Sequence, residues 1–127
     1  GLPTNDYHRN HEGWRANSRY LDIGDAVLPC NVAYYVKGEE FVVTKLKLVL
    51  NVNAQDEADR AYGHFFEVIS TLANAAIPGA LRDGKALEIR ADDAPLLVNG
   101  YAVAMRRIEW PNGIPGGHEL IFIIEVP

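Results

Sequence analysis

Three residues whose side chains could take part in acid–base chemistry lie beside one glycine-rich segment, residues 110–117 (WPNGIPGG). Arg107 and Glu109 precede this segment, and His118 follows it directly. A hairpin here would bring a guanidinium, a carboxylate and an imidazole together, and a histidine beside a carboxylate can titrate near neutral pH. Alternating charges at the ends of paired strands are more often surface ion pairs. We therefore expect surface pairs, and keep these three residues as catalytic candidates for an alternative enzymatic function.

Aromatic residues form a second candidate site. Tyr101 and Trp110 are the ligand-binding candidates, and with Tyr34 and Tyr35 they would line an aromatic groove for a ligand or peptide. Aromatic side chains in alternating strands also pack well for purely structural reasons. We expect the structural role and place any small-ligand pocket near residues 110–117.

Metal and phosphate sites find little support in the spacing of ligands. Four potential metal ligands lie within the first twelve residues: Asp6, His8, His11 and Glu12. Two histidines without a clear third and fourth ligand are a poor zinc signal. Asp92 and Asp93 lack the regularly spaced oxygen ligands of a calcium loop. The glycines of residues 110–117 precede a strand, whereas a phosphate-binding loop precedes a helix. The sequence predicts no metal and no cofactor.

A helix over residues 53–77 is the clearest element that could position such sites. Its apolar residues recur at steps of three and four: Ala58, Ala61, Tyr62, Phe65, Ile69, Leu72, Ala73 and Ala76. Asn53 is the expected N-cap, and Pro78 with Gly79 ends the helix because proline cannot continue the hydrogen-bond ladder.

Alternating apolar residues predict strands on both sides of this helix. Residues 27–37 and 41–52 read as a hairpin, and residues 87–90, 97–109 and 119–126 as three more strands. The order strand, strand, helix, strand, strand, strand predicts an α+β fold. We expect a single antiparallel sheet of about five strands with one long helix packed on one face.

The polar segment of residues 1–26 shows no regular period, so we expect an irregular N-terminal arm. Residues 27–127 would then form a single α+β domain, since 127 residues suit one hydrophobic core.

The second face of the expected sheet is unusually apolar. Five residues there are the interface candidates: Phe41, Val43, Val49, Ile121 and Ile123. An antiparallel sheet open to water should be more polar on that side, so something is expected to cover it. The arm, through Trp14, Tyr20, Leu21 and Ile23, is one candidate. A second copy of the chain or a further domain is another.

Charge and composition restrict the partners. The formal net charge of −5 gives no general electrostatic footprint for nucleic acid, and no run approaches the ~20 apolar residues that cross a bilayer. We expect no nucleic acid and no membrane contact from this segment. The single cysteine, Cys30, identifies no redox compartment. The chain opens on Gly1 rather than Met, so an upstream signal peptide, anchor or domain stays open and no localisation is predicted.

Three functions follow from these observations. The first is a non-enzymatic protein-interaction or binding domain, a possible homodimer, which could belong to a larger or envelope-associated protein. The second is a small enzyme or small-ligand binder with a pocket near residues 110–117. The third is an acidic inhibitor or immunity-type partner of a basic protein, for which the negative net charge is the only support.

Overall fold

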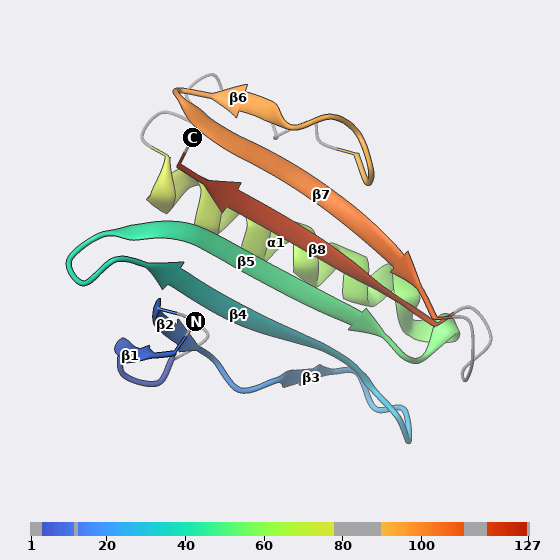
Figure 1. Ribbon diagram of the computed structural model, residues 1–127. Helices are drawn as coiled ribbons and strands as arrows, with labels where there is room; N and C mark the ends of the chain where they lie inside the picture. The colour runs from blue at the N-terminus through green and yellow to red at the C-terminus, as the bar shows by residue number, and fades with distance from the viewer. Residues whose placement is uncertain (1–3, 12, 78–89, 111–116, 127) are drawn as a thin grey trace.

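The chain folds as two layers, an antiparallel sheet and one helix packed against one of its faces (Figure 1). The structure is a computed structural model, and it describes residues 4–11, 13–77, 90–110 and 117–126. The predicted α+β class, the antiparallel sheet and the helix on one face are confirmed. The predicted number of about five strands is wrong, because the sheet has eight. Within the described residues, no helix is long and apolar enough to cross a membrane.

The strands run in the spatial order β1-β2-β4-β5-β8-β7-β6. β3 also pairs with β4, next to the part of β4 that pairs with β2. Their bounds are β1 His8–Asn10, β2 Gly13–Asn17, β3 Leu21–Ile23, β4 Cys30–Gly38, β5 Val43–Val52, β6 Leu96–Val98, β7 Tyr101–Glu109 and β8 His118–Glu125. The four long strands, β4, β5, β8 and β7, lie side by side at the centre. Each carries the alternating pattern that predicted a strand with one buried face.

The helix α1, Ala58–Ala76, follows a short 3₁₀ turn, η1, Gln55–Glu57. The expected apolar stripe is confirmed, since its buried residues are Ala58, Ala61, Phe65, Ile69 and Ala73. The expected N-cap was wrong. The Asn53 side chain instead donates a hydrogen bond to the carbonyl of Pro29 at 2.9 Å, which ties the end of β5 to the start of β4.

The hydrophobic core lies between α1 and the sheet. Alternation sends every second residue of the central strands toward the helix, and Val32, Leu48, Leu50, Val103 and Phe122 are fully buried there. Full burial of one such side chain stabilises the fold by roughly 1.5–3 kcal/mol. This layer therefore covers one face of the sheet.

Three of the additional strands come from the region expected to be an irregular arm. β1 and β2 form a hairpin, and β2 and β3 each pair with the same edge of β4. These strands are only three to five residues long, too short for alternation to reveal them. They form because β4, nine residues long, would otherwise present an unpaired row of backbone groups.

One further strand arises where a single strand over residues 97–109 was expected. The chain reverses at Asn99 and Gly100, whose φ angles of 48° and 87° fit a two-residue hairpin turn, and β6 pairs back on β7. The expected strand over residues 87–90 lies outside the described residues apart from Arg90, which is in no strand. Residues 111–116 also lie outside the described part. The backbone N–H of Trp110 donates to the carbonyl of Gly117 at 3.2 Å, which joins the two ends of that segment.

Candidate functional site

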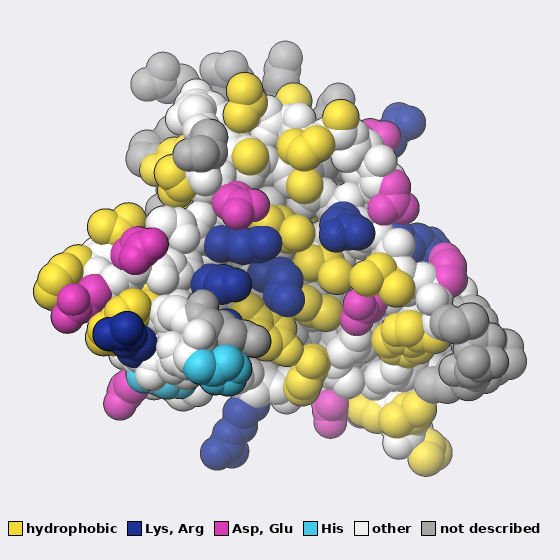
Figure 2. Space-filling model, in the orientation of Figure 1, with side chains coloured by type: hydrophobic (Ala, Val, Ile, Leu, Met, Phe, Trp, Pro, Cys, Tyr) yellow, Lys and Arg dark blue, Asp and Glu magenta, His cyan; other side chains and the backbone are white. Residues whose placement is uncertain are grey.

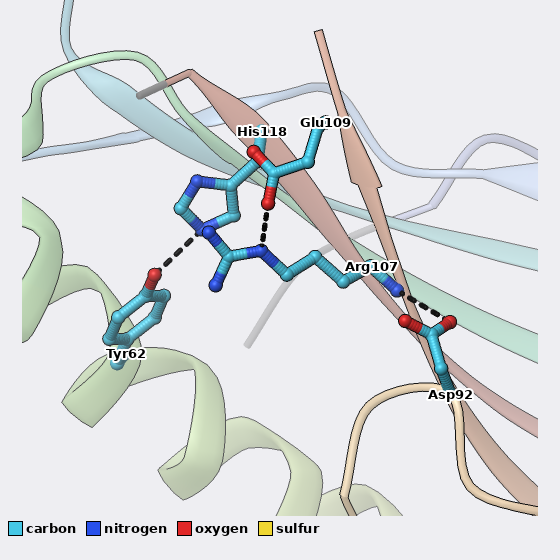
Figure 3. A network of polar contacts seen from close by, with 5 residues as sticks. All are labelled: Tyr62, Asp92, Arg107, Glu109 and His118. Carbon is cyan, nitrogen blue, oxygen red and sulfur yellow. Dashed lines mark hydrogen bonds and ion pairs between the residues drawn. The ribbon is translucent and has the colours of Figure 1, made fainter. Parts of the chain in front are cut away.

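The three acid–base candidates lie together at one end of the sheet. Arg107 and Glu109 belong to β7, and His118, the first residue of β8, is the cross-strand neighbour of Glu109. All three lie on the helix side, because Val103 and Met105 of the same β7 alternation are core residues. Figure 3 shows them with Tyr62, which projects from α1, and Asp92, which lies in the loop before β6.

His118 is the buried centre of this cluster. Its side chain has no exposed surface, and its Nε2 shares a hydrogen bond with the Tyr62 hydroxyl at 2.6 Å. The two rings also touch, with centroids 5.9 Å apart. A buried nitrogen without a partner would destabilise the fold, so Tyr62 fastens α1 to the end of β8. The sequence placed Tyr62 only in the apolar stripe, because periodicity does not reveal which strand a helix residue meets.

Arg107 and Glu109 form the exposed side of the cluster. Nε of Arg107 makes an ion pair with Oε1 of Glu109, and 42% and 61% of the two side chains are exposed. The backbone N–H of Arg107 donates to Oδ1 of Asp92 at 3.4 Å. Exposed pairs of this kind contribute little to stability, since water screens them.

The geometry favours a structural role for this cluster over acid–base catalysis. A general base must reach the proton that it removes, yet His118 is enclosed and its Nε2 is engaged by Tyr62. Five cavities of about 330 to 560 Å³ lie elsewhere on the molecule. None of these five is lined by His118, Arg107 or Glu109.

The two aromatic ligand candidates do not share a site. Tyr101 begins β7 and lines a cavity with Ala76 near the end of α1, whereas Trp110 follows the last residue of β7. The nine-residue strand β7 therefore places Tyr101 and Trp110 roughly 27–30 Å apart. Tyr34 lines the same cavity as Tyr101, and Tyr35 points to the opposite side of the sheet. A single aromatic groove is therefore not formed by these four residues.

The potential metal ligands are also dispersed. The described residues contain no group of three or more His, Cys, Asp or Glu side chains that could hold a metal ion. Nδ1 of His8 lies 2.8 Å from the carbonyl of Asp6, and Glu12 lies outside the described residues. Cys30 is buried in the core, with its Sγ 3.6 Å from the carbonyl of Ala54.

The interface candidates separate into two groups. Val49, Ile121 and Ile123 lie at the centre of the sheet face that points away from α1, with Val49 and Ile121 paired directly across β5 and β8. Phe41 and Val43 instead lie at the turn between β4 and β5, and Phe41 is 90% exposed. We call the sheet face opposite α1, which faces the viewer in Figures 1 and 2, the open face.

The described part of the N-terminal segment extends the sheet as β1, β2 and β3. Ile23 packs in the core on the helix side, Leu21 lines a cavity beside α1, and Trp14 stacks on Tyr7 with ring centroids 5.5 Å apart. Of the four aromatic and aliphatic residues expected to act as a cover, Tyr20 contacts the open face. Its hydroxyl is 2.9 Å from that of Tyr35. Burial, followed by this hydrogen bond, raises the pKa of Tyr35 to about 12.

The open face has a basic end and an apolar centre. Arg15, Lys37 and Lys45 are paired directly across β2, β4 and β5, and we call these three residues the basic row. Lys47 follows two residues after Lys45 on the same face. Figure 2 shows Lys and Arg side chains gathered near the centre of the view, with hydrophobic side chains beside them. The sequence does not reveal that these cations form one row, because their alignment depends on the register of three strands.

No protein-family model, no curated protein and no solved structure matches this chain. The function is therefore argued from the geometry of the sheet faces alone.

Proposed function

We propose that this chain is a protein-interaction domain that binds a partner protein through its open face, and that it is not an enzyme. The observation that carries the proposal is the combination of the basic row with an apolar centre on the sheet face that α1 does not cover. Both the basic row and the apolar centre are unfavourable for the isolated chain, and both would favour binding to a partner.

The apolar centre has more hydrophobic surface than a solvated sheet face needs. Ile121 and Ile123 stay partly exposed, and Ile108 of β7 is 40% exposed on the same face, whereas Val49, which pairs with Ile121, is buried. Antiparallel sheets with one solvated face normally alternate apolar and polar residues. Transfer of these exposed apolar side chains from water to contact with a partner's apolar residues is favourable, so their burial would contribute to affinity.

The basic row is also unexpected in a chain of net charge −5. Like charges directly opposite on paired strands destabilise a sheet. Lys37 has Arg15 on one side and Lys45 on the other, so two such contacts meet at one residue. A partner surface with carboxylates would convert this repulsion into attraction.

The charges favour a different protein over a second copy of this chain. The strands of the open face carry five Lys or Arg residues, namely Arg15, Lys37, Lys45, Lys47 and Arg106, and three carboxylates, namely Asp22, Glu119 and Glu125. Five minus three leaves an excess of two positive charges. Pairing this face with itself would therefore bring two positive surfaces together. The same positive excess argues against the third function, in which the chain would bind a basic protein, at least through this face.

Cysteine labelling tests the proposal. Cys30 is fully buried and should be silent, so an Ile123→Cys variant reports on the open face and an Asn74→Cys variant on the exposed side of α1. In extracts of the cells that make the protein, maleimide should label Ile123→Cys at least about fivefold more slowly than in the purified chain. Asn74→Cys should react equally in both.

Two outcomes would overturn the proposal. Equal labelling of Ile123→Cys in extract and in the purified chain would mean that nothing covers the open face. Protection in the concentrated purified chain that disappears on dilution would identify a second copy as the occupant, and light scattering would show the corresponding change in mass.

A further inference from the structure

A cavity of about 330 Å³ opens at the basic end of the open face. Its polar and aromatic lining residues are Arg15, Asn17, Tyr35, Lys37, Lys45 and Lys47. Backbone or side-chain atoms of Ala16 and Val36 complete the lining, and none of these eight residues is acidic. Four of the chain's 12 Lys and Arg residues thus surround one hollow.

Rigid strands hold these cations in place. Arg15 comes from β2, Lys37 from β4, and Lys45 and Lys47 from β5, so their backbones are fixed by continuous hydrogen-bonded pairing. Nζ of Lys47 lies 4.8 Å from the centroid of the Tyr35 ring, a cation–π contact that orients this lysine. The site is therefore built on the sheet and needs no loop to order on binding.

The electrostatics of the cavity differ in sign from those of the whole chain. The net charge of −5 repels polyanions at a distance, whereas four cations around a hollow attract an anion that comes close. Glu125 lies across from Lys45, and Lys37 and Lys45 also line a neighbouring cavity with Glu39, Glu40 and Glu125. The carboxylates therefore lie to one side of the hollow and none is in its lining.

We propose that this cavity binds carboxylate side chains of an acidic segment in the partner protein. The inference rests on the proposed function, because it names the chemistry of the partner at the same face. Lysine and arginine donate strong, charge-assisted hydrogen bonds to carboxylates. The volume of about 330 Å³ lies at the lower end of the range found for small-ligand pockets, so the cavity has room for a carboxylate side chain.

The surroundings of the cavity favour an acidic protein segment over a nucleic acid or a free phosphate. Lys47, at the cavity, is the cross-strand neighbour of Ile123, so the basic site continues into the apolar centre of the open face. An acidic segment with aliphatic residues would fill both regions. A phosphate backbone would gain nothing from Val49, Ile121 and Ile123.

Peptide titration with the full chain tests this assignment. A hexaglutamate peptide, followed by calorimetry at low salt, should bind, whereas hexaglutamine should not. Lys45→Gln and Lys47→Gln should each weaken hexaglutamate binding about fivefold. Arg60→Gln, which removes an exposed cation of α1 away from the cavity, should leave it unchanged. Circular dichroism melts would show that every variant is folded.

Several results would overturn the assignment. The first is that hexaglutamate does not bind. The second is that the Lys45→Gln and Arg60→Gln variants bind it equally well. The third is that a single-stranded oligonucleotide or inorganic phosphate binds more tightly than hexaglutamate. The labelling experiment separates this failure from that of the proposed function. Protection of Ile123→Cys without hexaglutamate binding would reject only the acidic-segment assignment. Binding of hexaglutamate without protection would reject the protein-interaction function and leave the anion site.

Discussion

Replacement of Lys37 by glutamine should stabilise the isolated chain. Lys37 is the middle member of the basic row, directly opposite Arg15 on β2 and Lys45 on β5. Paired positions on adjacent strands have Cβ atoms about 4.5–5.5 Å apart, so the three side chains leave the sheet side by side. Glutamine keeps most of the stem and removes the charge.

The expected gain follows from the two contacts. A like-charge pair in a cross-strand position costs roughly 0.2–1 kcal/mol, and Lys37→Gln removes two of them. We expect an increase in the free energy of unfolding of about 0.5–1.5 kcal/mol, which raises the melting temperature by roughly 2–6 °C in a domain of this size. Screening should abolish most of the gain at molar salt, where the Debye length is about 3 Å.

Urea unfolding at low and high salt measures this effect. Arg106→Gln is the matched control, because Arg106 lies on the same face but opposite Ile121, and its removal should change stability by less than about 0.5 kcal/mol. The same Lys37→Gln variant should bind hexaglutamate more weakly, so stability and binding move in opposite directions. A Lys37→Gln chain that is no more stable than Arg106→Gln, or a gain that persists in molar salt, would refute the electrostatic reasoning.

Four further predictions each concern a single residue. Tyr62→Phe removes the hydroxyl that bonds buried His118 and should lower the free energy of unfolding by about 1–3 kcal/mol, measured in urea. Gly63→Ala should stabilise the helix by about 0.5–1 kcal/mol because a Cβ there meets nothing within 4 Å. Gly100→Ala should destabilise the chain by about 1–2 kcal/mol, because its φ is +87°. The folded pKa of Tyr35, about 12, exceeds its unfolded value near 10, so its contribution to stability is present below about pH 10 and is lost as the pH rises toward 12. Ultraviolet titration should show a late tyrosinate transition that Tyr35→Phe removes.

Each of these predictions has a result that would count against it. Unchanged stability of Tyr62→Phe would mean that the hydrogen bond to His118 contributes no net stability. Equal effects of the two glycine replacements would show that backbone conformation does not govern them. A tyrosinate titration that Tyr35→Phe leaves unaltered would mean that burial does not shift this hydroxyl.

The long elements were predictable from the sequence because each depends on local periodicity. The stripe of α1 repeats over five turns, and the alternation of β5 and β8 covers whole strands. The hairpin that gathers Arg107, Glu109 and His118 likewise follows from two adjacent strands and the loop signal between them. The Asn99–Gly100 dipeptide, in contrast, was a strong local turn signal that the reading of one continuous strand overlooked.

The rest depends on contacts between distant parts of the chain. β1, β2 and β3 are stable only through the edge of β4 or through each other, and each is too short to show a period of its own. Arg15 and Lys37 meet only because β2 pairs with β4 in one particular register. A shift by one residue would send either side chain to the opposite face. Short sequences cannot specify such a register, and so the basic row emerged only from the folded sheet.

Site-specific photocrosslinking tests the central claim most directly. Benzoylphenylalanine would replace Ile123, the cross-strand neighbour of Lys47 on the open face, and, as a control, the exposed Phe66 on α1. We expect the probe at position 123 to cross-link to another protein through a segment rich in Asp and Glu, and the probe at position 66 not to do so. Equal cross-linking from both positions, cross-links to a second copy of this chain, or a cross-linked segment without acidic residues would contradict it.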